Sequence, residues 1–161
     1  MRVIIADTWP IHYLVLIGQS EILPALFEKL IIPLAVRDEL ARPEAPEVMR
    51  KWIQAPPHWL ELHPHPLSTF DDELESLDEG EREALALAAA LAADLLLLDD
   101  REGVRVARSK GFRVIGTLRV LHLAARRGLV DLADSFERIK RTNFRYRQAI
   151  LDKLLDQAEK G

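Results

Sequence analysis

Short apolar runs alternate with amphipathic stretches along most of the chain. Strands are predicted at residues 3–6, 31–33, 59–62, 95–98 and 112–115. Helices are predicted at residues 11–17, 21–30, 35–41, 47–53, 81–93, 103–110 and 118–127, with two more within 132–158. Gly80 is predicted to cap the helix that begins at Glu81. Strands that alternate with helices predict an α/β fold in which a central parallel sheet carries helices on both faces.

The length favours one domain. The chain has 161 residues and a mass of 18.3 kDa, which is close to the usual size of a single folded unit. Prolines crowd the segment 43–66, but Trp52 and Trp59 within it are predicted to be packing anchors rather than base-stacking residues. We therefore expect one domain over residues 1–161, with two C-terminal helices at about 132–158.

The amino-acid composition excludes several classes of function. The chain has no cysteine, which excludes disulfide scaffolds, thiolate zinc sites and thiol catalysis. Asp7 and His12 interrupt the apolar N-terminal stretch, so it predicts neither a signal peptide nor a membrane span. A cytoplasmic location without membrane contact is the expectation. Glycine-rich phosphate loops are also absent from the sequence.

Charge is segregated along the chain. The net charge is -4 and the isoelectric point is about 5.8, so there is no overall attraction to nucleic acid. Residues 71–83 contain eight acids and one base, whereas residues 138–147 contain five bases and no acid. Phe144 and Tyr146 interleave with the bases, and Arg141 and Arg145 are candidates to contact an RNA backbone. The alternative for this stretch is a solvated helix face.

Acids follow two of the predicted strands. Asp7 ends the first strand, Asp99 and Asp100 end the strand 95–98, and Glu39 and Glu81 are placed at predicted helix starts. Sites in open parallel sheets form beyond the carboxyl ends of the strands. Crowded carboxylates repel and require protons, bases or a divalent cation, for which Mg²⁺ or Mn²⁺ is the natural choice. The chemistry predicted is phosphodiester hydrolysis or phosphoryl transfer. For the aspartates, helix capping is the competing interpretation.

Five segments together resemble proteins of the PIN-domain family. They are residues 3–14 (VIIADTWPIHYL), 32–40 (IPLAVRDEL), 77–88 (LDEGEREALALA), 96–107 (LLLDDREGVRVA) and 111–118 (GFRVIGTL). The resemblance covers about residues 1–130 and is greatest to a PIN-like prokaryotic subgroup related to VapC-type toxin ribonucleases. It implies a three-layer α/β fold with a central parallel sheet and a Mg²⁺- or Mn²⁺-dependent ribonuclease site. It also implies an RNA substrate, a homodimer and an antitoxin protein as partner.

The resemblance assigns roles to individual acids. By position in the matched segments, Asp7, Glu81 and Asp100 would hold metal, with Asp99 as a secondary ligand. Glu39 would bind a second metal or position the attacking water. All four main acids (Asp7, Glu39, Glu81 and Asp100) are thus candidate catalytic residues.

Some positions depart from the family pattern. Trp9 stands where relatives usually have a small hydroxyl residue, Leu98 replaces a threonine or serine, and Arg119 replaces a glycine. Thr117 is a candidate to donate a hydrogen bond to a carboxylate or a phosphate, or else to cap the helix that follows.

Two other functions compete with the ribonuclease. One is a nucleic-acid-binding or partner-binding module that has the same fold without catalytic turnover. The acidic isoelectric point and Trp9 favour this function. The other is a receiver-like phosphoacceptor domain. That function ranks low, because Asp7 alone ends the first strand and no lysine follows the strand 112–115.

Overall fold

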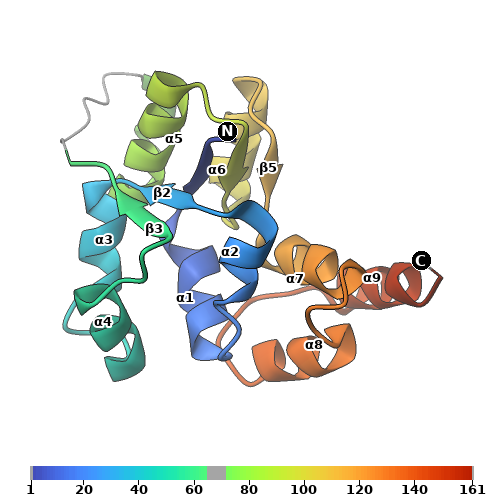
Figure 1. The fold of residues 1–161 in the computed structure, drawn as a ribbon. Coiled ribbons are helices and arrows are strands. Elements are labelled where there is room, and N and C mark those ends of the chain that lie inside the picture. Colours follow the sequence, from blue (N-terminus) through green and yellow to red (C-terminus); the bar gives the residue numbers. More distant parts are fainter. Residues whose placement is uncertain (1, 65–71, 161) are drawn as a thin grey trace.

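The computed structural model describes residues 2–64 and 72–160, in which a parallel sheet is covered by helices on both faces (Figure 1). The strands are β1 (Ile4–Ala6), β2 (Leu30–Ile32), β3 (Leu60–Leu62), β4 (Leu95–Leu97) and β5 (Val114–Ile115). The helices are α1 (Thr8–Leu16), α2 (Ile22–Phe27), α3 (Leu34–Leu40), α4 (Glu47–Gln54), η1 (Asp72–Leu74), α5 (Glu79–Leu91), α6 (Arg101–Ser109), α7 (Thr117–Arg126), α8 (Leu132–Lys140) and α9 (Gln148–Lys160). Asp71, the first acid of the predicted acidic run, and Pro66 lie outside the described residues.

Side chains alternate between two cores because successive residues of a strand point to opposite faces of the sheet. Ile4 and Ala6 of β1 belong to a large core that includes apolar residues of α1, α2, α7, α8 and α9. Ile5 between them belongs to a second core with residues of α5 and α6. The helices thus form one layer on each face of the sheet, which confirms the predicted three-layer α/β fold.

The order of the strands determines where a site can form. The sheet runs β3-β2-β1-β4-β5, and every neighbouring pair is parallel. The chain moves outward from β1 to β3 and then returns to the other side of β1 through β4, so the order reverses between β1 and β4. Asp7 and Asp99 follow these two strands at their carboxyl ends, which is the usual position of a site in an open α/β sheet.

Three local predictions are wrong in instructive ways. Leu30 was expected to end a helix, but it begins β2 and pairs with Leu60. Glu39 was expected near a helix start, yet it lies in the last turn of α3, which ends at Leu40. Helix α5 begins two residues earlier than predicted, so Gly80 lies inside it and does not cap it.

The proline-rich segment packs as predicted. Trp59 is buried, and its ring centroid lies 5.8 Å from that of Trp52, which packs against the same core. Both indoles are thereby packing residues. In the described part of the chain, no helix has both the length and the apolar character needed to cross a membrane.

Candidate metal centre and its grooves

Asp7 is the centre of the site. It follows β1 and precedes α1, and its side chain is 1% exposed. Neither carboxylate oxygen has a hydrogen-bond partner among the described residues, and the side chain does not cap α1. The capping interpretation therefore fails for Asp7. A buried carboxylate without partners is costly, which means that the site is built for something that compensates the charge.

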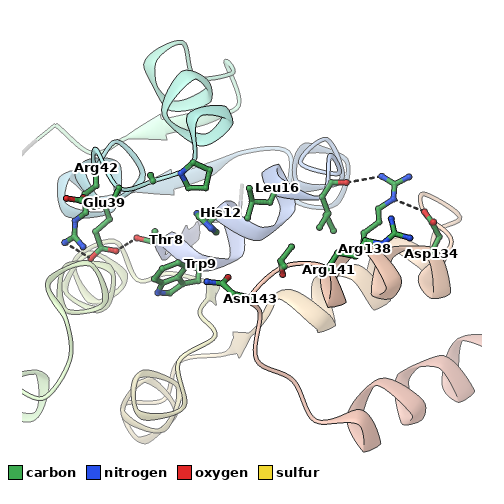
Figure 2. A pocket seen from close by; sticks show the side chains of 15 residues that line it. Thr8, Trp9, His12, Leu16, Glu39, Arg42, Asp134, Arg138, Arg141 and Asn143 are labelled. Carbon is green, nitrogen blue, oxygen red and sulfur yellow. Dashed lines mark hydrogen bonds and ion pairs between the residues drawn. The ribbon is translucent and has the colours of Figure 1, made fainter.

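Two acids from distant segments join Asp7. One carboxylate oxygen from each of Asp7, Glu39 and Asp78 lies within 4.8 Å of the others. Glu39 is held in place because Thr8 Oγ1 donates to its Oε2, as Figure 2 shows, and the Gly80 N–H donates to its Oε1 at 3.2 Å. Three oxygen donors at this separation suit a hard divalent cation.

Asp78 holds its position as the N-cap of α5. Its Oδ1 accepts from the Glu81 backbone N–H at 2.8 Å. The sequence from Asp78 to Glu81 is thus the D-x-x-E form of a capping box, in which the first residue caps the helix and the fourth is acidic. The Asp78 carboxylate also contacts the Glu81 side chain.

Glu81 and Asp100 border this cluster. The Glu81 side chain is 5% exposed, and its Oε2 has no partner among the described residues. Asp100 is exposed and caps α6, because its Oδ2 accepts from the Gly103 N–H at 3.0 Å. Capping thus accounts for one oxygen of Asp100 and leaves the other available.

Asp99 is hydrogen-bonded to the first residue of α7. Its Oδ1 accepts from the Thr117 N–H at 2.8 Å and its Oδ2 from the Thr117 hydroxyl at 2.6 Å. Thr117 is the first residue of α7 rather than its cap, which is Gly116. The Thr117 hydroxyl thus donates to a carboxylate, and its role in substrate binding stays a prediction. Both oxygens of Asp99 are engaged, unlike those of Asp7.

Two glycines make room for the carboxylates. A Cβ at Gly80 would lie 2.7 Å from Glu39 Oε1, and a Cβ at Gly103 would lie 2.7 Å from Glu81 Oε2. Both contacts are closer than side-chain atoms tolerate, so any larger residue displaces the acid that it faces. The glycines of the two matched segments are thus explained by packing against Glu39 and Glu81.

The electrostatics of the cluster favour neutral carboxyls until a cation binds. Burial raises the pKa of Asp7 well above its ordinary value, and the negative charges of Asp78 and Glu39 raise it further. Burial also raises the pKa of Glu39, against the hydrogen bond from Thr8. The pKa of Glu81 rises to about 10, mainly through burial and then through its contact with Asp78. Such groups hold protons that a divalent cation would replace.

Two grooves open beside these acids, one on each side of a wall formed by Trp9 and Asn143. The first, here the α1 groove, has a volume of about 1280 Å³ and contains Glu39 and Arg141. The second, here the acidic groove, has a volume of about 1050 Å³. Its acids are Asp78, Glu81, Asp99 and Asp100, and its basic residues are Arg101, Arg108, Arg119, Arg145 and Arg147.

Of the basic segment predicted from the sequence, Arg138 and Lys140 belong to the last turn of α8, and residues 141–147 form a loop. The loop connects α8 to α9 and is anchored on α1, where the Tyr13 hydroxyl donates to Asn143 Oδ1 at 2.9 Å. The Phe144 ring meets Tyr13 edge to face at 4.9 Å. This anchoring places Arg145 in the wall of the acidic groove, whereas Arg141 lines the α1 groove (Figure 2).

Sequence reasoning therefore found most of the acids but missed Asp78. Asp78 was counted among the eight acids of a charged run, and the D-x-x-E pattern was the signal that could have separated it from its neighbours. Glu39, which the resemblance assigns to a second metal or to the attacking water, lies in a cluster with Asp7 and Asp78.

These features define a class of protein. A parallel α/β sheet with partnerless buried carboxylates at its reversal point has the donor set for Mg²⁺ or Mn²⁺. The family model for the PIN domain matches residues 3–160, and the chain belongs to the PIN domain family. The match extends past residue 130, where the resemblance was expected to end, through α8 and α9. Members of this family are commonly metal-dependent nucleases. A comparison with curated proteins gave no match.

Proposed function

We propose that this protein is a metal-dependent endoribonuclease that hydrolyses RNA phosphodiesters in the acidic groove. The observation that carries the proposal is the buried Asp7 carboxylate, which has no partner in the described chain and has oxygens of Glu39 and Asp78 nearby. The family supports a nuclease, and the resemblance to toxin ribonucleases supports RNA as the substrate.

The cation would be held by Asp7 with Glu39 and Asp78, and Glu81 and Asp100 are further candidates at the border of the cluster. When bound, Mg²⁺ or Mn²⁺ supplies Lewis-acid stabilisation of the charge that develops on a phosphodiester during hydrolysis. All other contributions to the reaction come from residues of the protein itself. Thr8 and Gly80 orient Glu39, while Thr117 orients Asp99.

The walls of the acidic groove supply substrate binding. Arg145 and Arg147 are exposed arginines that suit contacts with backbone phosphates. Tyr146, which is 40% exposed, offers a ring on which a base can stack. Acids on one wall and arginines on the other place the phosphate against the cation and hold the strand on both sides of it.

The test is cleavage of a mixed RNA pool, and of a DNA pool of the same sequences, in Mn²⁺, Mg²⁺ or EDTA. Wild type and Asp7→Asn are compared with Asp152→Asn, a matched control on α9 whose exposed carboxylate accepts from Gln148 Nε2 at 2.9 Å. We expect wild type and the control to cleave RNA only with metal, and Asp7→Asn to be inactive. Equal cleavage by Asp7→Asn would refute the proposal.

A second candidate function is an RNA-binding module without turnover. Trp9 favours it, because this residue is 38% exposed and forms the wall between both grooves beside the acids (Figure 2). This function predicts tight RNA binding that EDTA does not change and no cleavage with any metal. An antitoxin and a homodimer stay predictions of the resemblance.

A further inference from the structure

A small basic pocket lies between α7 and α9, which pack against each other (Figure 1). Its volume is about 400 Å³, and no acid is among the residues that line it: Arg119, His122, Arg126, Gln157 and Lys160. We call it the α7–α9 pocket. Lys160 is paired with Asp156 at 2.9 Å, whereas Arg126 has no carboxylate partner in the described chain. The pocket therefore has a surplus of positive charge.

His122 gives the pocket a second, independent feature. Its Nδ1 lies 3.3 Å from Nη1 of Arg119. A guanidinium can only donate hydrogen bonds, so Nδ1 accepts and the proton of the neutral ring is on Nε2. That Nε2 is buried and has no partner among the described residues. The His122 side chain is thus a buried N–H donor that lacks an acceptor.

The charge around His122 is also unbalanced. Burial and the positive charges of Arg119 and Arg126 lower the pKa of the imidazole, so the ring is neutral at physiological pH. An anion in the pocket would neutralise both arginines, and it reaches the buried Nε2–H once the side chains that cover this atom move. Arg119 and Arg126 are exposed and flexible, and they can turn toward an anion that enters.

We propose that the α7–α9 pocket binds a phosphate group. Phosphate fits because it offers several acceptor oxygens to the two guanidinium groups and to the Nε2–H. Arg119 also lines the acidic groove, so this residue is shared by the pocket and the candidate active site. The source of this phosphate rests on the proposed function: it is a backbone phosphate of the same RNA strand, beyond the position that is cleaved. A free phosphate ion has the same chemistry.

The binding of inorganic phosphate tests the pocket without any cleavage. Phosphate is titrated in EDTA at constant ionic strength with chloride, and the assigned His122 imidazole signals are followed by long-range ¹H–¹⁵N spectroscopy. We compare wild type with Arg126→Gln and with Arg113→Gln, an exposed arginine before β5 at the opposite end of the sheet. Losing one charge-assisted contact should weaken phosphate binding about tenfold in Arg126→Gln and leave Arg113→Gln unchanged.

Some results would overturn the proposal. A ring with its proton on Nδ1, a titration that does not saturate, or equal affinity in Arg126→Gln and wild type would each exclude a built phosphate site. The spectra are recorded in EDTA, so this failure is separate from a failure of the ribonuclease, which only the cleavage assay with Asp7→Asn detects.

The source of the phosphate is decided with single-stranded RNA of increasing length. If RNA displaces inorganic phosphate from the pocket, and Arg126→Gln weakens only the longer strands, the occupant is the RNA backbone. If phosphate binds and RNA never competes, the occupant is a free phosphate. Both results support the pocket and differ only in the ligand that fills it.

Discussion

Replacing Asp7 by asparagine should stabilise the metal-free protein, although it removes the central acid of the site. Neither Asp7 side-chain oxygen has a hydrogen-bond partner in the described chain, and the Oδ1 of an asparagine can keep the favourable approach of the Thr8 backbone N–H. Asparagine has nearly the same shape, and its NH₂ group can donate to the oxygens of Glu39 and Asp78. The only large change is the loss of a buried group that can ionise.

The size of the effect follows from the geometry and from the raised pKa. Two unit charges 4.8 Å apart, the limit that holds for Asp7 and its neighbours, repel by about 3.5 kcal/mol at an effective dielectric constant near 20. The folded protein avoids this repulsion by keeping Asp7 protonated, because burial raises its pKa. The unfolded chain ionises Asp7 above about pH 4. Folding then takes up a proton, and the free energy of unfolding falls by up to about 1.4 kcal/mol for each pH unit above that value.

The pH dependence of the free energy of unfolding therefore has the opposite sign to that caused by an ion-paired acid. The wild type should lose stability as pH rises from 5 to 8 in EDTA, and Asp7→Asn should lose less. Their difference should grow from near zero at low pH to about 1–3 kcal/mol in favour of Asp7→Asn. A divalent cation reverses the order, since a ligand at 100 times its Kd adds about 2.7 kcal/mol to the wild type alone.

The assay is urea unfolding followed by tryptophan fluorescence at pH 5, 6, 7 and 8, in EDTA and in Mn²⁺ or Mg²⁺. Asp156→Asn is the control, because its exposed pair with Lys160 should change stability by at most about 0.5 kcal/mol. If Asp7→Asn is less stable than wild type in EDTA at pH 8, Asp7 has a structural role and the reasoning from its lack of partners is wrong.

Three further variants test other parts of the site. Gly80→Ala should displace Glu39 and lower Mn²⁺ affinity about tenfold by calorimetry, while the higher helix propensity of alanine preserves stability; unchanged affinity would contradict the packing argument. Thr117→Val removes the hydroxyl bond to Asp99 and should lower the free energy of unfolding by about 1 kcal/mol and slow cleavage. Arg145→Gln should reduce the slope of log K against log salt for RNA binding in EDTA by about one, and a slope equal to wild type would place Arg145 outside the interface.

The parts of the fold that depend on local sequence were predictable. Asp7 was placed correctly because an apolar run that ends in an acid is a short-range pattern. Leu30 was misassigned because an apolar residue between a helix and a strand satisfies both patterns, and only its pairing with Leu60 decides. The error at Glu39 has a different origin, since the predicted helix 35–41 nearly coincides with α3 and Glu39 lies in the second half of both.

The residues that form the acid cluster could be identified only from the three-dimensional structure. Glu39 and Asp78 are far apart in the chain, and they meet only because α3 packs against α5. Within the acidic run, the sequence shows many carboxylates of equal type but not which one points inward. The capping bond from the Glu81 N–H distinguishes Asp78 from the others, because it fixes the side chain at the helix start beside Asp7.

The negative net charge does not argue against RNA as a ligand, because affinity for phosphate depends on where the charges lie. The charge of -4 includes the buried and bordering acids of the site, several of which hold protons until a cation binds. The arginines of the acidic groove, in contrast, are exposed, and the Tyr13 contacts keep the loop that carries Arg145 and Arg147 beside the acids. Cation binding would neutralise the acidic wall and leave the arginines as the dominant field in the groove. RNA affinity should therefore rise when the metal binds, which couples the two ligands of the site through charge alone.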